Sequence, residues 1–174
     1  AAAVILPKNF RCPGLNDSKL LSAEQREHYK IIIEKKAIAY AVAMVSHEEI
    51  DRINILRASL KAMHMAIAQL AVIPELLLID GNYFSPYPFI PHQCIIDGDA
   101  TYASIAAAGI LAKTYRDAYM QQLHLEYPHY NWFRNKGYGT PEHRRAIELY
   151  GLSKYHRRSF NIFSAQTEKT ISED

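Results

Sequence analysis

Apolar residues in this chain fall into short continuous runs and longer stretches with helical spacing. Short apolar runs bounded by turn residues are typical of buried strands, and they predict strands at residues 1–6, 37–45, 75–80 and 93–97. Helical spacing and capping signals predict helices at residues 22–34, 46–70 with a break near Asn54, 104–126 and 141–150. We therefore expect a protein that mixes strands and helices.

The ends of these helices carry local signals. Ser22 and Ser46 each open a capping-box pattern, in which a Ser side chain and a following Gln or Glu exchange hydrogen bonds with the backbone. Pro141 and Gly151 bracket the last helix. The small apolar residues at 105–112 predict a helix face that packs closely on the sheet and is largely buried.

Composition narrows the class of protein. The 174 residues suit one domain, and 49% hydrophobic with 22% charged residues argues against disorder. No apolar stretch is long enough to predict a membrane span. The two cysteines, Cys12 and Cys94, are too few for a disulfide framework and lack the spacing of a zinc site, which favours a reducing, cytoplasmic setting.

The distribution of charge is more informative than the net charge of +2, which is too small to indicate a nucleic-acid partner. Basic and aromatic residues gather in the C-terminal part of the chain, a mixture that suits a phosphate backbone with its sugars and bases. The basic residues are Lys136, Arg144, Arg145, Lys154, Arg157 and Arg158, and the aromatic ones are Tyr127, Tyr130, Trp132, Phe133, Tyr138 and Tyr155.

Carboxylates stand at the ends of two predicted strands. Asp80 closes the run at 75–80, and Asp99 follows the run at 93–97. Carboxylates at one sheet edge can hold divalent cations, although metal-dependent phosphodiester hydrolysis normally uses more of them. The alternative is that Asp80 simply opens a turn, because Asp-Gly and Gly-Asn are common turn pairs.

Residues 136–140 are a second candidate for function. Gly137 and Gly139 flank Tyr138 and would let the backbone approach a phosphate or sugar. A tyrosine presented in this way could stack on a base or bond a 2′-hydroxyl. An ordinary flexible turn before a helix explains the same residues equally well.

Short segments spread over the chain match one family in order and spacing. They are residues 14–19, 79–82, 98–99, 104–113, 116–117, 136–140 and 156–160. By these motifs the chain resembles bacterial ribonuclease HII from about Ala1 to Phe163. The blocks at 104–113 and 136–140 are the most specific for that family.

This resemblance implies an α/β, ribonuclease-H-like fold, with a mixed sheet flanked by helices and a helical C-terminal part. It implies a catalytic core at 1–126 without its first strand, a substrate-binding part at 127–163 and a tail at 164–174. The implied activity is endonucleolytic cleavage of RNA in RNA–DNA hybrids and 5′ to ribonucleotides embedded in duplex DNA, by two-metal hydrolysis with Mg²⁺ or Mn²⁺. A monomer that acts in DNA replication and repair is expected.

The resemblance also implies roles for single residues. Asp80 and Asp99 correspond to the third and fourth acidic residues of the active site, as catalytic residues and metal ligands. Tyr138 corresponds to the tyrosine that recognises the junction between a ribonucleotide and a deoxyribonucleotide. The other substrate-binding residues are expected to be Lys19, Ser104, Lys136, Gly137, Arg157 and Arg158.

The chain departs from the family pattern at its start, at Leu20 and at Asp97. It begins inside the family's Ala-rich strand, so the preceding strand with its Asp-Glu pair and Gly-Arg-Gly motif is absent. We therefore expect a fragment of a longer protein, inactive as it stands. Leu20 replaces a lysine and removes a phosphate contact. Asp97 also replaces a lysine: on a strand it would share a face with Asp99 and make the site more negative, or it is only a solvated charge.

Two functions remain open from the sequence. The first is a metal-dependent ribonuclease of this family. The second is a catalytically dead, non-catalytic module with the same fold, which would hold a hybrid duplex through Tyr138 and the basic C-terminal part without cutting it.

Overall fold

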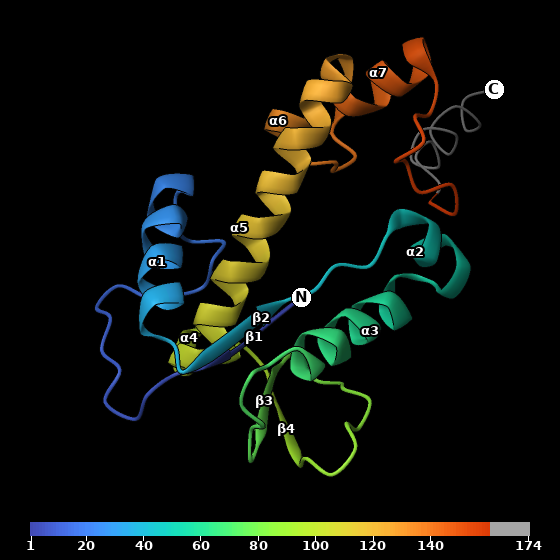
Figure 1. Cartoon of the computed structure of the whole chain (residues 1–174). Helices are drawn as coiled ribbons and strands as arrows, with labels where there is room; N and C mark the ends of the chain where they lie inside the picture. The colour runs from blue at the N-terminus through green and yellow to red at the C-terminus, as the bar shows by residue number, and fades with distance from the viewer. Residues whose placement is uncertain (161–174) are drawn as a thin grey trace, which may run out of the picture. The chain divides into compact units, whose positions relative to one another are not determined.

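The computed structural model of this chain describes residues 1–160 (Figure 1). These residues belong to two compact units. The first unit comprises Ala1–Val45 and Leu56–Arg116, and the second comprises Ser46–Ile55 and the chain from Asp117 onward. The expected boundary near residue 126 stays a prediction, and the expected tail at 164–174 lies outside the described residues.

Strands and helices occur where the sequence predicts them. The break near Asn54 is confirmed, because Asn54 has φ 70° and separates two helices. Within residues 1–160, no helix is long and apolar enough to cross a membrane. In chain order the elements are β1 (Ala2–Ile5), α1 (Ala23–Lys36), β2 (Ala39–Val42), α2 (His47–Ile53), α3 (Ile55–Ala68), β3 (Leu77–Asp80), β4 (His92–Ile95), α4 (Gly98–Thr101), α5 (Ala103–Glu126), the 3₁₀ turn η1 (Pro128–Tyr130), α6 (Trp132–Asn135) and α7 (Pro141–Tyr150).

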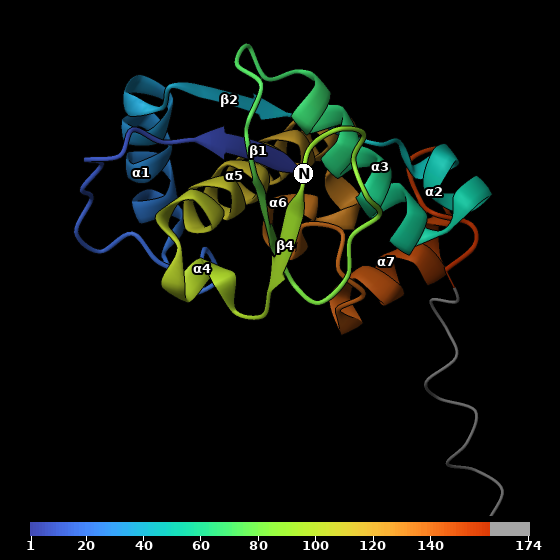
Figure 2. The same ribbon diagram turned by 90° about the horizontal axis from the view of Figure 1, so that it is seen from below.

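Both antiparallel and parallel pairs of strands occur. Strand β1 pairs antiparallel with β2, with Ala2 opposite Val42. Strand β3 pairs in parallel with β4, the strand labelled in Figure 2. Asp80 lies opposite Ile95. In the part of the chain that is described, the two pairs are hydrogen-bonded separately.

The buried face of α5 forms the main core of the first unit. Ala107, Ile110 and Leu111 are fully enclosed, and Ile33 of α1 packs against them. Residues of β1 and β2 complete the cluster. The predicted burial of this helix face is therefore confirmed.

A second cluster in the first unit holds α3 against β3. Ile67, Leu77, Ile79 and Phe84 are buried together. Because side chains alternate along a strand, Leu77 and Ile79 anchor β3 in the core while its last residue, Asp80, is exposed.

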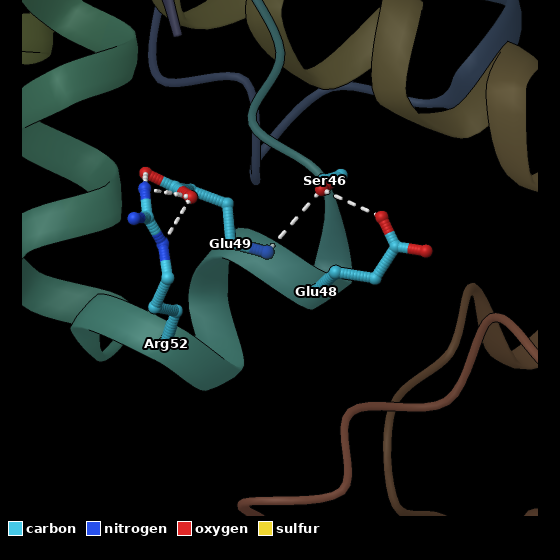
Figure 3. Close-up of polar contacts among 4 residues, drawn as sticks. All are labelled: Ser46, Glu48, Glu49 and Arg52. Atoms are coloured by element: carbon cyan, nitrogen blue, oxygen red, sulfur yellow. Dashed lines mark hydrogen bonds and ion pairs between the residues drawn. The ribbon is translucent and has the colours of Figure 1, made fainter.

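Capping explains where the early helices begin. At α1 the full capping box forms: Ser22 Oγ accepts from the Gln25 N–H at 3.1 Å, and Gln25 Oε1 accepts from the Ser22 N–H at 2.8 Å. At α2 only the Ser half forms. Ser46 Oγ accepts from the Glu49 N–H at 3.3 Å, whereas the Glu49 carboxylate pairs with Arg52 at 2.6 Å (Figure 3). The predicted capping box at Ser46 is wrong in its second hydrogen bond, from the Ser46 N–H to the Glu49 side chain, because Arg52 binds that carboxylate.

The second unit has its own aromatic core. Met120 and Leu123 of α5 pack with Tyr130 and Trp132, and with Ile147 of α7. The rings of Tyr130 and Trp132 stack with centroids 5.0 Å apart. The C-terminal half of α5 is thereby tied to the segment that carries residues 136–140.

The α5 core gives a stability prediction. Ile110→Ala should lower the free energy of unfolding by about 2–5 kcal/mol, because it leaves a cavity in a fully buried cluster. Ile31→Ala is the matched control, since Ile31 is 64% exposed and should lose less than about 1 kcal/mol. Urea unfolding followed by circular dichroism measures both. Equal losses in the two variants would show that α5 does not form the core described above.

Candidate active site

Asp80 is held at the end of a strand that is anchored in the core. Its Oδ1 accepts a hydrogen bond from the Gly98 N–H at 3.2 Å. Gly98 follows β4, the parallel neighbour of β3, so this bond joins the ends of the two strands. The side chain of Asp80 is exposed. The turn interpretation is thus incomplete, because the carboxylate is oriented by a backbone donor from the next strand.

Asp99 lies in the first turn of α4, immediately after Gly98. A Cβ atom at Gly98 would lie 2.6 Å from Ile105 Cδ1, the end of a flexible side chain, so a substitution at Gly98 would require Ile105 to repack. Burial, followed by the charges of Asp80 and Asp17, raises the pKa of the Asp99 carboxyl. The effect of Asp80 on the pKa of Asp99 indicates that the fold places the two predicted carboxylates in one site.

Asp97 does not have the position that the sequence predicts. Strand β4 ends at Ile95, and Asp97 adopts a left-handed conformation with φ 52° in the turn before α4. Asp97 and Asp99 therefore do not alternate along one strand, and the inference that they share a strand face is wrong. The carboxylates that act on Asp99 are Asp80 and Asp17.

Asp17 is a member of the site that sequence reasoning did not single out. Asp17 also raises the pKa of Asp99, which indicates that the two carboxyl groups lie close together. The loop around it is ordered by the Lys19 N–H, which donates to Asp17 Oδ1 at 2.9 Å. Lys19 Nζ also lies 3.9 Å from Asp17 Oδ2, and the Lys19 side chain is 80% exposed. The available signal was the motif at residues 14–19, which contains Asp17.

Lys19 therefore lies beside the acidic residues, as the prediction requires of a residue near a phosphate. Its charge opposes the other causes and lowers the pKa of Asp99. Ser104 is half-buried in the first turn of α5, on the helix that follows α4. An open cavity of about 410 Å³ adjoins Asp99 and is lined on its other side by Phe10, Arg11 and Cys12.

The side chains at this site are of a type that binds hard divalent cations. Asp80 and Asp99 offer carboxylate oxygens, the ligands that Mg²⁺ and Mn²⁺ prefer. Burial and repulsion by Asp80 raise the pKa of Asp99, and a cation bound between the two carboxylates would offset this repulsion. Among residues 1–160, no group of at least three His, Cys, Asp or Glu side chains is arranged to hold a metal ion.

In the second unit, residues 136–140 form an ordered turn. Lys136 and Gly137 have φ 51° and 77°. Asn135 fixes both sides of the bend: its Oδ1 accepts from the Gly137 N–H at 2.9 Å, and its backbone oxygen accepts from the Tyr138 N–H at 2.9 Å. The Tyr138 side chain is 59% exposed. The turn is thus held by hydrogen bonds and presents the tyrosine outward, while its role in recognition stays a prediction.

The basic residues of the second unit differ in their environments. Lys136 Nζ lies 4.9 Å from the centre of the Phe133 ring, and the Arg157 guanidinium lies 3.7 Å from the centre of the Phe160 ring. The backbone N–H of Arg158 donates to Asp51 Oδ2 at 2.8 Å, and Arg158 is exposed. Hydrogen bonds from Ser159 and Arg158 lower the pKa of Asp51.

Lys154 has a different environment from these residues. Its ammonium lies 2.8 Å from a carboxylate oxygen of Glu126. This lysine is therefore paired, whereas Arg158 is exposed.

Comparisons with known proteins agree with these motifs. The family model of ribonuclease HII matches residues 1–163. Ribonuclease HII of Parabacteroides distasonis is 59% identical over 166 residues, which cover 95% of this chain and 83% of that protein. Ribonuclease HII of Bacteroides thetaiotaomicron is 60% identical over 162 residues, which cover 93% of this chain and 81% of that protein.

Solved structures support the fold. The ribonuclease H2 of Pyrococcus horikoshii OT3 matches with a TM-score of 0.72 and 22% identity, over 86% of this chain and 78% of that one. The PCNA:RNase HII complex of Archaeoglobus fulgidus contains a chain that matches with a TM-score of 0.69 and 22% identity, over 91% of this chain and 82% of that one. With the family pattern matched over residues 1–163 and such high identity to bacterial relatives, this chain belongs to the ribonuclease HII family and is a ribonuclease H hydrolase.

Proposed function

We propose that this enzyme cuts the RNA strand of RNA–DNA hybrids and cleaves 5′ to ribonucleotides embedded in duplex DNA, by two-metal hydrolysis with Mg²⁺ or Mn²⁺. The observation that carries the proposal is the pairing of Asp80 and Asp99 through Gly98 at the end of the parallel strand pair. Family membership favours an enzyme over a non-catalytic hybrid-binding module.

In this proposal each residue acts through the geometry described above. Asp80 and Asp99 supply two of the ligands to the metal ions. When bound, a divalent cation supplies Lewis-acid stabilisation of the charge that develops on the scissile phosphate. Lys19 is exposed beside Asp17 and can pair with a phosphate oxygen of the substrate.

Recognition of the ribose is assigned to the second unit. The exposed Tyr138 side chain can stack on the sugar or bond its 2′-hydroxyl, the group that distinguishes RNA from DNA. Arg157 and Arg158 are proposed to contact phosphates, with Lys136 and Gly137 approaching the backbone beside Tyr138. Ser104 is proposed as a further contact from the first unit.

The setting of the enzyme is proposed from weaker signals. Cys12 and Cys94 are both free thiols, which suits a reducing compartment. We propose that the enzyme acts as a monomer in the cytoplasm, on ribonucleotide-containing DNA that arises during replication and repair.

The carboxylate pair gives a prediction for catalysis. In the complete protein, Asp80→Asn should reduce Mg²⁺-dependent cleavage of a duplex with one ribonucleotide by at least about 100-fold, because it removes a charged metal ligand. Folding should be unaffected, since Asp80 is exposed at a strand end. Single-turnover cleavage and thermal unfolding measure the two effects.

Asp97→Asn is the matched control for Asp80→Asn. It removes a neighbouring exposed carboxylate that does not act on Asp99, so cleavage and the half-saturating Mg²⁺ concentration should stay unchanged. An active Asp80→Asn protein would refute the role of Asp80. A lower Mg²⁺ affinity in the control would restore a role for Asp97.

The turn at 136–140 gives a prediction for specificity. Tyr138→Ala should reduce cleavage at a single embedded ribonucleotide by about tenfold or more, because loss of one stacking contact is worth about 1–3 kcal/mol. Tyr150→Ala removes a tyrosine of similar exposure, 61% against 59%, and should leave the rate unchanged. An undiminished rate in Tyr138→Ala would count against its role in reading the junction.

A further inference from the structure

A buried chain of polar rings in the second unit leads to the backbone of Tyr138. It consists of Trp132, His143 and His156, all less than 9% exposed, with Ser153 at its far end. His143 Nδ1 lies 2.9 Å from the carbonyl oxygen of Tyr138. The exposed tyrosine is therefore connected, through its own backbone, to a buried network that does not face solvent.

The partners of His143 define its protonation state. A carbonyl oxygen can only accept, so His143 Nδ1 carries the hydrogen that is donated to Tyr138. The indole N–H of Trp132 can only donate, and it donates to His143 Nε2 at 3.0 Å. His143 is therefore a neutral imidazole with its hydrogen on Nδ1.

The partners of His156 lead to the complementary tautomer. The Ser153 backbone N–H donates to His156 Nδ1 at 2.9 Å, so Nδ1 accepts and the hydrogen of the neutral ring is on Nε2. This Nε2–H points to His143 Nε2, 3.1 Å away. Both donors, from Trp132 and from His156, thus converge on the same unprotonated nitrogen of His143.

The carbonyl of Tyr138 is held from two sides. It accepts from the Thr140 N–H at 2.8 Å and from His143 Nδ1–H at 2.9 Å. On the other side of the turn, Asn135 holds the N–H groups of Gly137 and Tyr138. The backbone of Tyr138 is therefore fixed at both its donor and its acceptor, while its side chain stays exposed.

We propose that His143 is a positioning residue for ribonucleotide recognition, which acts by holding the carbonyl of Tyr138 and thereby setting the place of the tyrosine ring. This inference rests on the proposed role of Tyr138 as the residue that reads the ribose. His156 and Trp132 support it by keeping the hydrogen of His143 on Nδ1. His143 itself is buried and contacts no substrate.

The network also makes the turn sensitive to acid. A proton added to His143 Nε2 would face the N–H groups of Trp132 and His156, and burial disfavours the charge as well. Burial lowers the pKa of His143, and burial together with the nearby His143 lowers the pKa of His156 to about 4. The charge of Glu142 favours protonation of His143. The neighbours His47 and His129 disfavour protonation of His156. The Tyr130 ring packs on both imidazoles.

The direction of the pH effect follows from these shifts. Because the unfolded chain binds protons near pH 6.5 and the folded network does not, stability falls as the pH decreases from 6.5 towards about 4. At neutral pH the network is intact.

Two substitutions at His143 separate positioning from packing. Asparagine carries its amide nitrogen near the place of Nδ1 and can still donate to Tyr138, whereas glutamine carries its amide near Nε2 and cannot. Binding is measured with a duplex that contains one ribonucleotide and with the same duplex in all-deoxy form, with Ca²⁺ in place of Mg²⁺. The preference is the ratio of the affinities for the ribonucleotide-containing and the all-deoxy duplex. We expect this ratio to fall about tenfold in His143→Gln and to stay close to the wild-type value in His143→Asn.

A purely structural role predicts the opposite order, because glutamine fills the site better than the smaller asparagine. In the background of Tyr138→Ala, His143→Gln should cause no further loss of preference, since the two residues act as one unit. An equal loss in both backgrounds, or a better-binding glutamine variant, would overturn the proposal.

Measurements without substrate keep the inference separate from the proposed function. Hydrogen exchange at residues 137–140 should be faster in His143→Gln than in the wild type, and near normal in His143→Asn. In the wild-type protein at pH 7, ¹⁵N NMR should show the hydrogen of His143 on Nδ1, a result that needs no variant to fold. An Nε2–H tautomer or unchanged exchange would overturn the positioning role. Normal positioning without any ribonucleotide preference in the wild type would instead overturn the proposed function.

Discussion

The carboxylate site depends on one close contact, the approach of Gly98 to Ile105 and to the carboxylate of Asp80. The Gly98 N–H orients Asp80, and the absence of a Cβ lets α4 begin directly against α5. A side chain here would place a Cβ 2.6 Å from Ile105 Cδ1, and the Ile105 side chain would have to repack. The orientation of Asp80 therefore depends on the backbone of a residue that has no chemical function itself.

The site also concentrates negative charge. Asp80 is exposed at its strand end, whereas burial of Asp99, followed by the charges of Asp80 and Asp17, raises the pKa of the Asp99 carboxyl. Lys19 lies at the edge of this group and opposes the effect. A cluster of like charges with one neighbouring cation is costly in an apo protein and becomes favourable when a divalent ion or a substrate phosphate complex is present.

The sequence predicted the helices and strands well where their ends depend on interactions between residues that are close in the chain. Each of these signals acts within a short stretch of backbone. Examples are the capping hydrogen bonds at Ser22, the break at Asn54, and Pro141 and Gly151 at the two ends of α7. The carboxylates Asp80 and Asp99 could be found because they follow apolar strands. The end of β4 could not be predicted, since it depends on the left-handed turn at Asp97, a conformation that apolar periodicity does not report.

Contacts between distant segments were beyond the reach of the same reasoning. Asp17 belongs to the carboxylate group through a fold that brings the loop after β1 beside α4. The family motif marked the segment of Asp17, but only the tertiary structure showed what this residue contacts. The carboxylate of Glu49, by contrast, has a local competitor: Arg52, three residues further on, binds it in a bidentate manner, more strongly than a single backbone N–H does.

The two units solve the problem of positioning in different ways. In the first, charged side chains are themselves the functional groups, so the protein holds Asp80 by a neutral backbone donor at a glycine. In the second, the functional side chain of Tyr138 has to stay exposed, and the buried His143 holds its backbone instead. With both imidazoles neutral, the network holds this carbonyl without burying a charge, and the donors of Trp132 and His156 share the lone pair of His143 Nε2. A buried lysine or arginine at position 143 would hold the same carbonyl at the cost of a desolvated charge beside Trp132, which explains why histidine suits this place.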